Sequence, residues 1–122
     1  MDTPIRKLST KSESTTVENP PGIFRTAITY DKDTMLCHFT MTKGAEIPLH
    51  NHLAAQIGYV VSGKVKFKKE SGEEFVASTG TSYVFSSNEK HGANVLETAE
   101  VIEVFAPMRP EYSEEEVTKN KK

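Results

Sequence analysis

The chain of 122 residues has one cysteine, Cys37, no tryptophan and no long apolar run. A single cysteine cannot form an internal disulfide or a cysteine-based zinc site, so any metal must be bound by His, Asp, Glu or Gln. No apolar run approaches the roughly 20 residues of a membrane helix, and residues 1–20 contain no apolar signal core. We therefore expect a cytoplasmic protein with no membrane partner.

Neither sign of charge dominates the sequence. The 15 Lys and Arg residues are offset by 17 Asp and Glu residues, which gives a formal net charge of −2. Such a balance provides no positive field that would attract a phosphate backbone or an anionic lipid surface. We therefore expect no nucleic-acid partner.

Apolar helix formers are also scarce. Leu, Ala and Met number 17, whereas Val, Ile, Thr, Phe and Tyr, which favour strands, number 39. Apolar or alternating runs of about 4 to 8 residues are separated by turn residues, and none has a helical period. Many short strands at this spacing are typical of a closed sheet. We predict an all-β fold, a small antiparallel β-barrel or jelly roll.

Apolar residues concentrate in residues 21–110. We expect this segment to be the barrel, between a flexible N-terminal arm (1–20) and a polar, mostly disordered C-terminal tail (111–122). Alternation in the second expected strand directs Cys37 toward the core. The expected strands cover residues 23–30, 35–42, 57–61, 65–69, 75–77, 83–85 and 101–106, with turns that include Ser62-Gly63 and a hairpin turn at 70–73.

Three of the four histidines lie at strand junctions rich in turn residues. His50 and His52 are two residues apart, so on an extended backbone their side chains point to the same face. Gln56 begins the next apolar run, and His91 follows a further pair of expected strands. Such residues can converge inside a barrel, where imidazole nitrogens and an amide oxygen suit Zn, Ni, Mn or Fe. A His-x-His pair also occurs on strand surfaces without any metal.

A second polar group lies at the end of the last expected strand. Val101, Glu103 and Phe105 share one face by alternation, and Arg109 follows. If that face is the interior, Glu103 could transfer a proton and Arg109 could bind a carboxylate through its planar fork. If the opposite face fills the core, Glu103 is exposed to water. The pattern leaves both arrangements open, because both faces are partly apolar.

The histidine segment resembles the first motif of the cupin superfamily, a group of small β-barrels. That motif is a glycine, five residues, His-x-His, three or four residues, an acidic residue, six residues and a glycine. Gly44, His50, His52 and Gly63 match its spacing, with Gln56 in the acidic position. The resemblance implies a cupin barrel.

The second cupin motif is matched in part. Gly80 and His91 have the expected separation, whereas Ser86, Asn88 and Val95 replace its proline, glycine and asparagine. The resemblance to both motifs implies a divalent transition metal as cofactor. With a neutral amide in place of a carboxylate, the metal charge would be left uncompensated and would favour anionic oxygen ligands. The implied metal ligands are His50, His52, Gln56 and His91.

Three His with one Gln, together with an acid-x-Phe-x-Pro-x-Arg segment, are similar to the pectin-degradation cupins that linearise unsaturated uronates. This resemblance implies that Glu103 and Arg109 are catalytic, with Glu103 at the position of an aspartate in that group. It also implies that Phe105 and Arg109 contact a small anionic substrate. Tyr59 and Tyr83 could also reach the cavity, and we expect Tyr59 to contact the substrate, although aromatic residues in small barrels usually serve packing.

The expected function is that of a metal-dependent isomerase or lyase acting on a sugar acid. An iron-dependent dioxygenase and a non-catalytic cupin that binds a small ligand stay open as alternatives, because the same ligand set supports either role. Cupin barrels commonly pair through a sheet face or a swapped terminal strand, so we also expect a homodimer.

Overall fold

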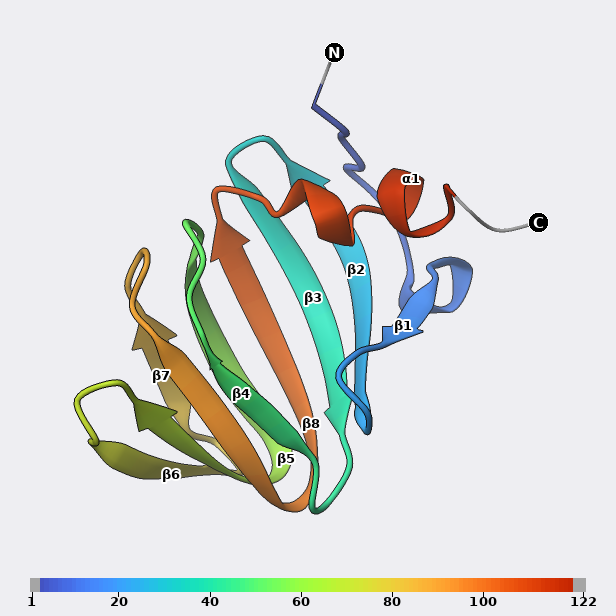
Figure 1. Ribbon diagram of the computed structural model, residues 1–122. Coiled ribbons are helices and arrows are strands. Elements are labelled where there is room, and N and C mark those ends of the chain that lie inside the picture. Colours follow the sequence, from blue (N-terminus) through green and yellow to red (C-terminus); the bar gives the residue numbers. More distant parts are fainter. Residues whose placement is uncertain (1–2, 120–122) are drawn as a thin grey trace.

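Eight antiparallel strands form one continuous, strongly curved sheet (Figure 1). The computed structural model describes residues 3–119. Short helical segments flank the sheet at η1 (Lys11–Glu13), η2 (Pro110–Tyr112) and α1 (Glu114–Val117). The strands are β1 (Thr16–Glu18), β2 (Ile23–Asp31), β3 (Thr34–Met41), β4 (Glu46–His50), β5 (Ala55–Lys69), β6 (Glu74–Ser78), β7 (Ser82–Phe85) and β8 (His91–Ala106).

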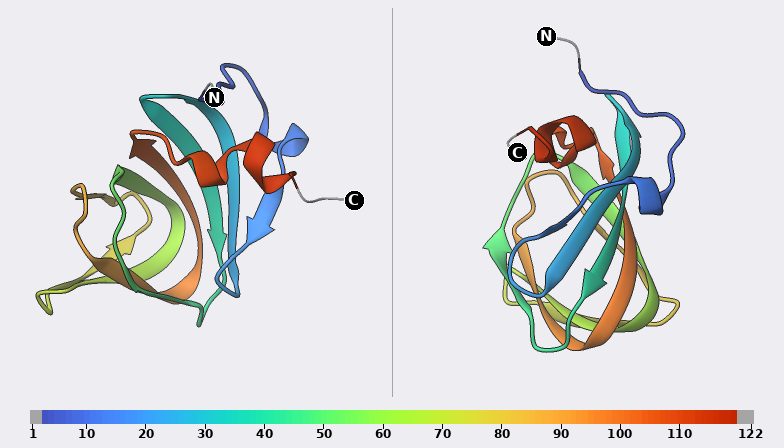
Figure 2. Two further views of the ribbon diagram at one scale, coloured as in Figure 1. Left: turned by 45° about the horizontal axis from the view of Figure 1, so that its top comes forward. Right: turned by 90° about the vertical axis from the view of Figure 1, so that its right-hand side faces the viewer.

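The long strands β5 and β8 connect the two layers of the fold. The first half of β5 pairs with β7 and with the end of β8, whereas its second half pairs with β6 and with the start of β8. β3 pairs with the end of β8, and β4 pairs with its start. Both long strands thus pass from one layer into the other, and the sheet curves around an interior (Figure 2). The predicted all-β jelly roll is confirmed.

The bend in β5 lies at Ser62-Gly63, where the sequence pattern predicts a turn between two strands. Pairing with β8 continues on both sides of the bend, with register shifts between Val60 and Val65. Gly63 has a φ of +96°, and a Cβ there would lie 2.3 Å from the carbonyl oxygen of Thr98. Glycine alone meets both constraints. The prediction of separate strands is therefore wrong, because this glycine bends one strand instead of ending it.

The interior is filled by the alternating residues that the sequence pattern indicates. Cys37 is fully buried between Met35 and Phe39 on the inner face of β3, as predicted. On β8, Glu103 and Phe105 are also buried. Of the two arrangements that the pattern leaves open, the structure therefore has the one in which Glu103 faces the interior.

Both ends of the chain contact the barrel where they are described. β1 pairs with β2, so part of the expected flexible arm extends the sheet. On the C-terminal side, the carboxylate of Glu114 accepts hydrogen bonds from the backbone nitrogen and the hydroxyl of Thr15 at 2.8 and 2.6 Å. The helical turns η2 and α1 lie across β2 and β3 at one end of the barrel (Figure 2). Residues 120–122 of the expected tail are outside the described residues.

The described residues contain no helix that is long and apolar enough to span a membrane.

Candidate metal centre and active site

Three histidine side chains meet at one end of the interior. Pairing of β4 with β8 places His50 opposite His91, and His52 follows two residues beyond β4. The ring centroids are 4.5 Å apart for His50 and His91, 5.4 Å for His50 and His52, and 5.2 Å for His52 and His91. One ring nitrogen from each histidine lies within 4.8 Å of the others. The three imidazoles that the sequence motifs single out are therefore brought together.

Backbone carbonyls orient all three rings. The Nδ1 atom of His50 lies 2.9 Å from the carbonyl oxygen of Pro48, that of His52 lies 2.6 Å from that of Ala54, and that of His91 lies 2.8 Å from that of Glu89. A carbonyl oxygen can only accept, so each Nδ1 carries a proton, which leaves Nε2 as the nitrogen that can bind a metal.

The surroundings of His52 and His91 favour the neutral, metal-binding form of histidine. Burial lowers the pKa of His91 to about 4 and also lowers that of His52. The Nε2 atom of His52 is buried and has no hydrogen-bond partner among residues 3–119. A buried lone pair without a partner is costly unless a ligand meets it. The donor set therefore fits a divalent transition metal, as imidazole ligands whose other nitrogen is fixed by a carbonyl do.

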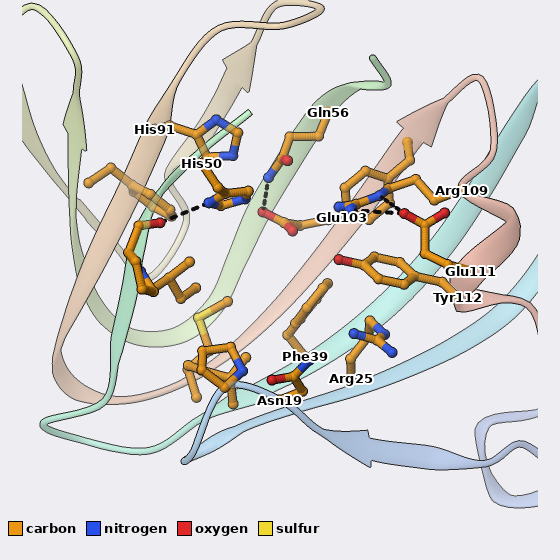
Figure 3. A pocket seen from close by; sticks show the side chains of 17 residues that line it. Asn19, Arg25, Phe39, His50, Gln56, His91, Glu103, Arg109, Glu111 and Tyr112 are labelled. Atoms are coloured by element: carbon orange, nitrogen blue, oxygen red, sulfur yellow. Dashed lines mark hydrogen bonds and ion pairs between the residues drawn. The ribbon is translucent and has the colours of Figure 1, made fainter. Parts of the chain in front are cut away.

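Gln56 links the histidines to the proposed acid. Its side chain is buried, and its Nε2 donates a hydrogen bond of 2.9 Å to Oε2 of Glu103 (Figure 3). The amide nitrogen is thereby engaged, and the amide oxygen is left as the group that can meet a cation. A glutamate at position 56 would place two carboxylates in contact, which a buried site disfavours. This contact gives a physical reason for the amide in the acidic position of the motif.

Glu103 is a buried carboxyl held by two donors. Its Oε2 accepts the Gln56 bond and a second bond of 2.6 Å from the Tyr83 hydroxyl. Burial raises the pKa of Glu103 to about 7, against the opposing effect of these hydrogen bonds and of the Arg109 charge. A carboxyl with such a pKa can both accept and release a proton near neutral pH.

The sequence analysis allows Tyr83 to reach the cavity but assigns it no role in the site. β7 pairs with β5 so that Tyr83 lies opposite Gly58, and a Cβ at position 58 would lie 2.3 Å from the Tyr83 ring. The missing side chain at Gly58 is therefore what lets the hydroxyl reach Glu103. In the sequence, the strand alternation places Tyr83 on the same face as Phe85, and in the structure this face is the buried one.

Phe105 and Arg109 line the same cavity as the acid. The cavity has a volume of about 530 Å³, within the range of small-molecule sites, and His50, His91 and Gln56 line it as well. The Nε and Nη2 atoms of Arg109 lie 3.2 and 3.1 Å from Oε2 of Glu111, and the Arg109 guanidinium lies over the Tyr112 ring. The histidine group and the Glu103–Arg109 group, which lie far apart in the sequence, therefore line one cavity.

Tyr59 does not join these residues. On β5, Gln56 and Gly58 point inward, and Tyr59 points to the opposite, outer face of the sheet. There, 48% of Tyr59 is exposed. The strand alternation directs its side chain away from this cavity, and its contact with the substrate stays a prediction.

An antiparallel jelly roll with three converging imidazoles belongs to the class of small β-proteins that carry a candidate transition-metal site. Residues 37–105 match the cupin domain, and the chain belongs to the cupin family.

The chain is similar to proteins named for pectin degradation and to a further cupin structure. The pectin degradation protein KdgF of Dickeya dadantii is 34% identical over 110 residues, which cover 88% of this chain and 99% of the relative. The structure of KdgF from a Halomonas species superposes with a TM-score of 0.79 at 31% identity, over 88% of this chain and 100% of that one. An RmlC-like cupin from Shewanella frigidimarina has the same TM-score at 24% identity, over 87% of this chain and 95% of that one, which shows the fold alone.

Proposed function

We propose that this protein is a metal-dependent isomerase that converts a cyclic 4,5-unsaturated monouronate to its open-chain keto form. The observation that carries the proposal is the buried Glu103 carboxyl, which lines one cavity with His50, His91 and Arg109. The similarity to proteins named for pectin degradation supports a sugar acid as substrate.

The proposed reaction moves one proton and breaks one bond. The hydroxyl on carbon 1 loses its proton and becomes an aldehyde as the bond from carbon 1 to the ring oxygen breaks. The electrons released onto the ring oxygen form a ketone at carbon 5, and the π electrons of the double bond between carbons 4 and 5 bind a proton at carbon 4. The product has the composition of the substrate, so no oxidant or reductant is needed.

Each residue has a separate role in this proposal. Glu103 accepts and delivers the proton at its carboxyl oxygens, for which its pKa of about 7 is suited. Arg109 orients the substrate carboxylate, and Phe105 packs against the sugar ring. His50, His52, His91 and Gln56 would hold the metal, which supplies positive charge to stabilise oxygen anions.

The test combines metal analysis with a turnover assay. Purified protein is analysed for bound metals and then incubated with an unsaturated monouronate, while the absorbance of the conjugated double bond is followed. We expect the wild type to remove this absorbance. We expect Glu103→Gln to retain the metal and to lose at least about 100-fold in rate, because general acid–base catalysis contributes that much. Glu97→Gln, at an exposed site paired with Lys64, is the matched control and should keep full activity.

The same assay separates the alternatives. A reaction that stops without oxygen would identify an iron-dependent dioxygenase and refute the isomerase. Thermal stabilisation by the uronate with no product would instead support a binding protein. Full activity of Glu103→Gln would remove that carboxyl from the mechanism.

We also propose that two copies associate through the outer face of the sheet. Ile57, Tyr59 and Val84 lie on neighbouring strands there and are 52%, 48% and 60% exposed. Contiguous exposed apolar side chains are typical of interaction surfaces. Light scattering should give a dimer for the wild type and a monomer for Tyr59→Glu, and a monomeric wild type would contradict the proposal.

A further inference from the structure

Arg25 is a buried cation on the inner face of β2. It lies between Ile23 and Ala27 in the strand alternation, and only 8% of it is exposed. Its guanidinium carbon lies 3.7 Å from the centroid of the Tyr112 ring. Among residues 3–119, no carboxylate forms an ion pair with it and no side chain accepts a hydrogen bond from it. A charge at such a position is costly unless a partner meets it.

The acidic groups of the cavity are engaged elsewhere. Glu111 is bound to Arg109, and Oε2 of Glu103 accepts from Tyr83 and Gln56. The cavity that Arg25 lines therefore contains a cation that contacts the Tyr112 ring but that no carboxylate of residues 3–119 pairs with. An anionic ligand is the partner that this arrangement lacks.

Tyr112 places Arg25 and Arg109 opposite each other. The two guanidinium carbons lie 3.7 and 4.1 Å from the same ring centroid. Two groups stacked this closely cannot share one face of the ring, so they occupy opposite faces, as Figure 3 shows. Phe105 packs edge-on against Tyr112 at 5.7 Å and fixes the ring between them.

This spacing suits one carboxylate. The two guanidinium carbons are no more than about 7.8 Å apart, the two centroid distances combined. Two hydrogen bonds of about 2.9 Å and the width of a carboxylate group span such a gap at the ring edge. Guanidinium groups are planar and bind carboxylates through paired hydrogen bonds, which gives the geometry its selectivity.

We propose that Arg25 and Arg109, on the two faces of Tyr112, clamp the carboxylate of the ligand, so that Arg25 determines specificity for acidic over neutral sugars. The inference rests on the proposed function for the uronate as ligand. It adds a residue from β2, which lies outside the motifs that indicate the metal site and the last strand.

The test measures binding to the metal-loaded protein by calorimetry, with D-galacturonate and its neutral counterpart D-galactose as probes. The wild type should bind galacturonate more tightly than galactose. Arg25→Gln should weaken galacturonate binding by about 10- to 100-fold and leave galactose binding unchanged. Arg25→Lys should recover part of the affinity, because it restores the charge without the fork. Arg6→Gln, which removes an arginine that lies 3.7 Å from Glu114, is the matched control and should bind as the wild type does.

Two outcomes overturn the clamp. One is equal binding of the two sugars by the wild type, and the other is undiminished galacturonate binding by a folded Arg25→Gln. If that variant does not fold, the Arg25 Nε–H signal of the wild type is followed by NMR during galacturonate titration, and an unmoved signal at saturation refutes the proposal. Binding of galacturonate requires no turnover. Arg25-dependent binding without linearisation therefore refutes the reaction alone, and linearisation with an unchanged KM in Arg25→Gln refutes the clamp alone.

Discussion

Burial of Glu103 should make the stability of the metal-free protein depend on pH. The pKa of this carboxyl is raised from 4.5 to about 7 in the folded chain. Below pH 4.5 both states hold the proton, and the carboxyl contributes no pH dependence. Between pH 4.5 and 7 the unfolded chain releases the proton while the folded chain keeps it, so the free energy of unfolding falls as pH rises. Above pH 7 the full cost is reached, on the order of 3 kcal/mol.

Glu103→Gln isolates this effect, because an amide keeps an oxygen for the Tyr83 and Gln56 donors but cannot ionise. The variant should gain up to about 3 kcal/mol relative to the wild type between pH 4 and pH 8. Urea unfolding of the metal-stripped proteins at several pH values measures the difference. The comparison also removes the opposite trend from His91, whose lowered pKa makes stability rise with pH toward 6.5. A difference that is constant across this range would refute the buried, proton-holding carboxyl.

Three further outcomes follow from the site. His91→Ala should lower the metal content of the purified protein at least about 10-fold by elemental analysis, because even the loss of a group that only orients a ligand has an effect of this size, and full occupancy would exclude His91 as a ligand. Tyr83→Phe should lower kcat about 10-fold with little change in KM, because it removes one of the two donors to Glu103; unchanged kcat would mean that Gln56 suffices. Gly58→Ala should reduce the free energy of unfolding by about 1–3 kcal/mol in urea, because the new methyl group overlaps the Tyr83 ring, and an unaltered midpoint would show that the ring can move aside.

The fold was predictable to the extent that side chains alternate. β3 has a clean period of two, and its inner face is correct residue by residue. The bend in β5 was not predictable, because Ser62-Gly63 has the composition of a turn whether the chain reverses or only bends. The sequence analysis expects the last strand only over residues 101–106, whereas β8 begins at His91. The alternation is interrupted where Leu96 and Glu97 are both exposed, so the pattern does not reveal the first part of the strand.

The metal-binding part of the site was predictable because short sequence spacings place its histidines. His50 and His52 are close in sequence, and a known motif adds His91. Strand pairing across the barrel, which a local pattern does not encode, brings Arg25 to the cavity and the Tyr83 hydroxyl to Glu103. The placement of Glu103 was undecided in the sequence because both faces of its strand are partly apolar, and three-dimensional packing selects one of them.

The carbonyl acceptors behind the three imidazoles belong to the main chain, at Pro48, Ala54 and Glu89. No point substitution deletes a main-chain oxygen, so the tautomer of each ring is insulated from mutation of its neighbours. An engineer who wishes to retune this centre must therefore exchange the rings themselves or displace the strand ends that carry them. Alanine scanning around the site would miss these supports altogether.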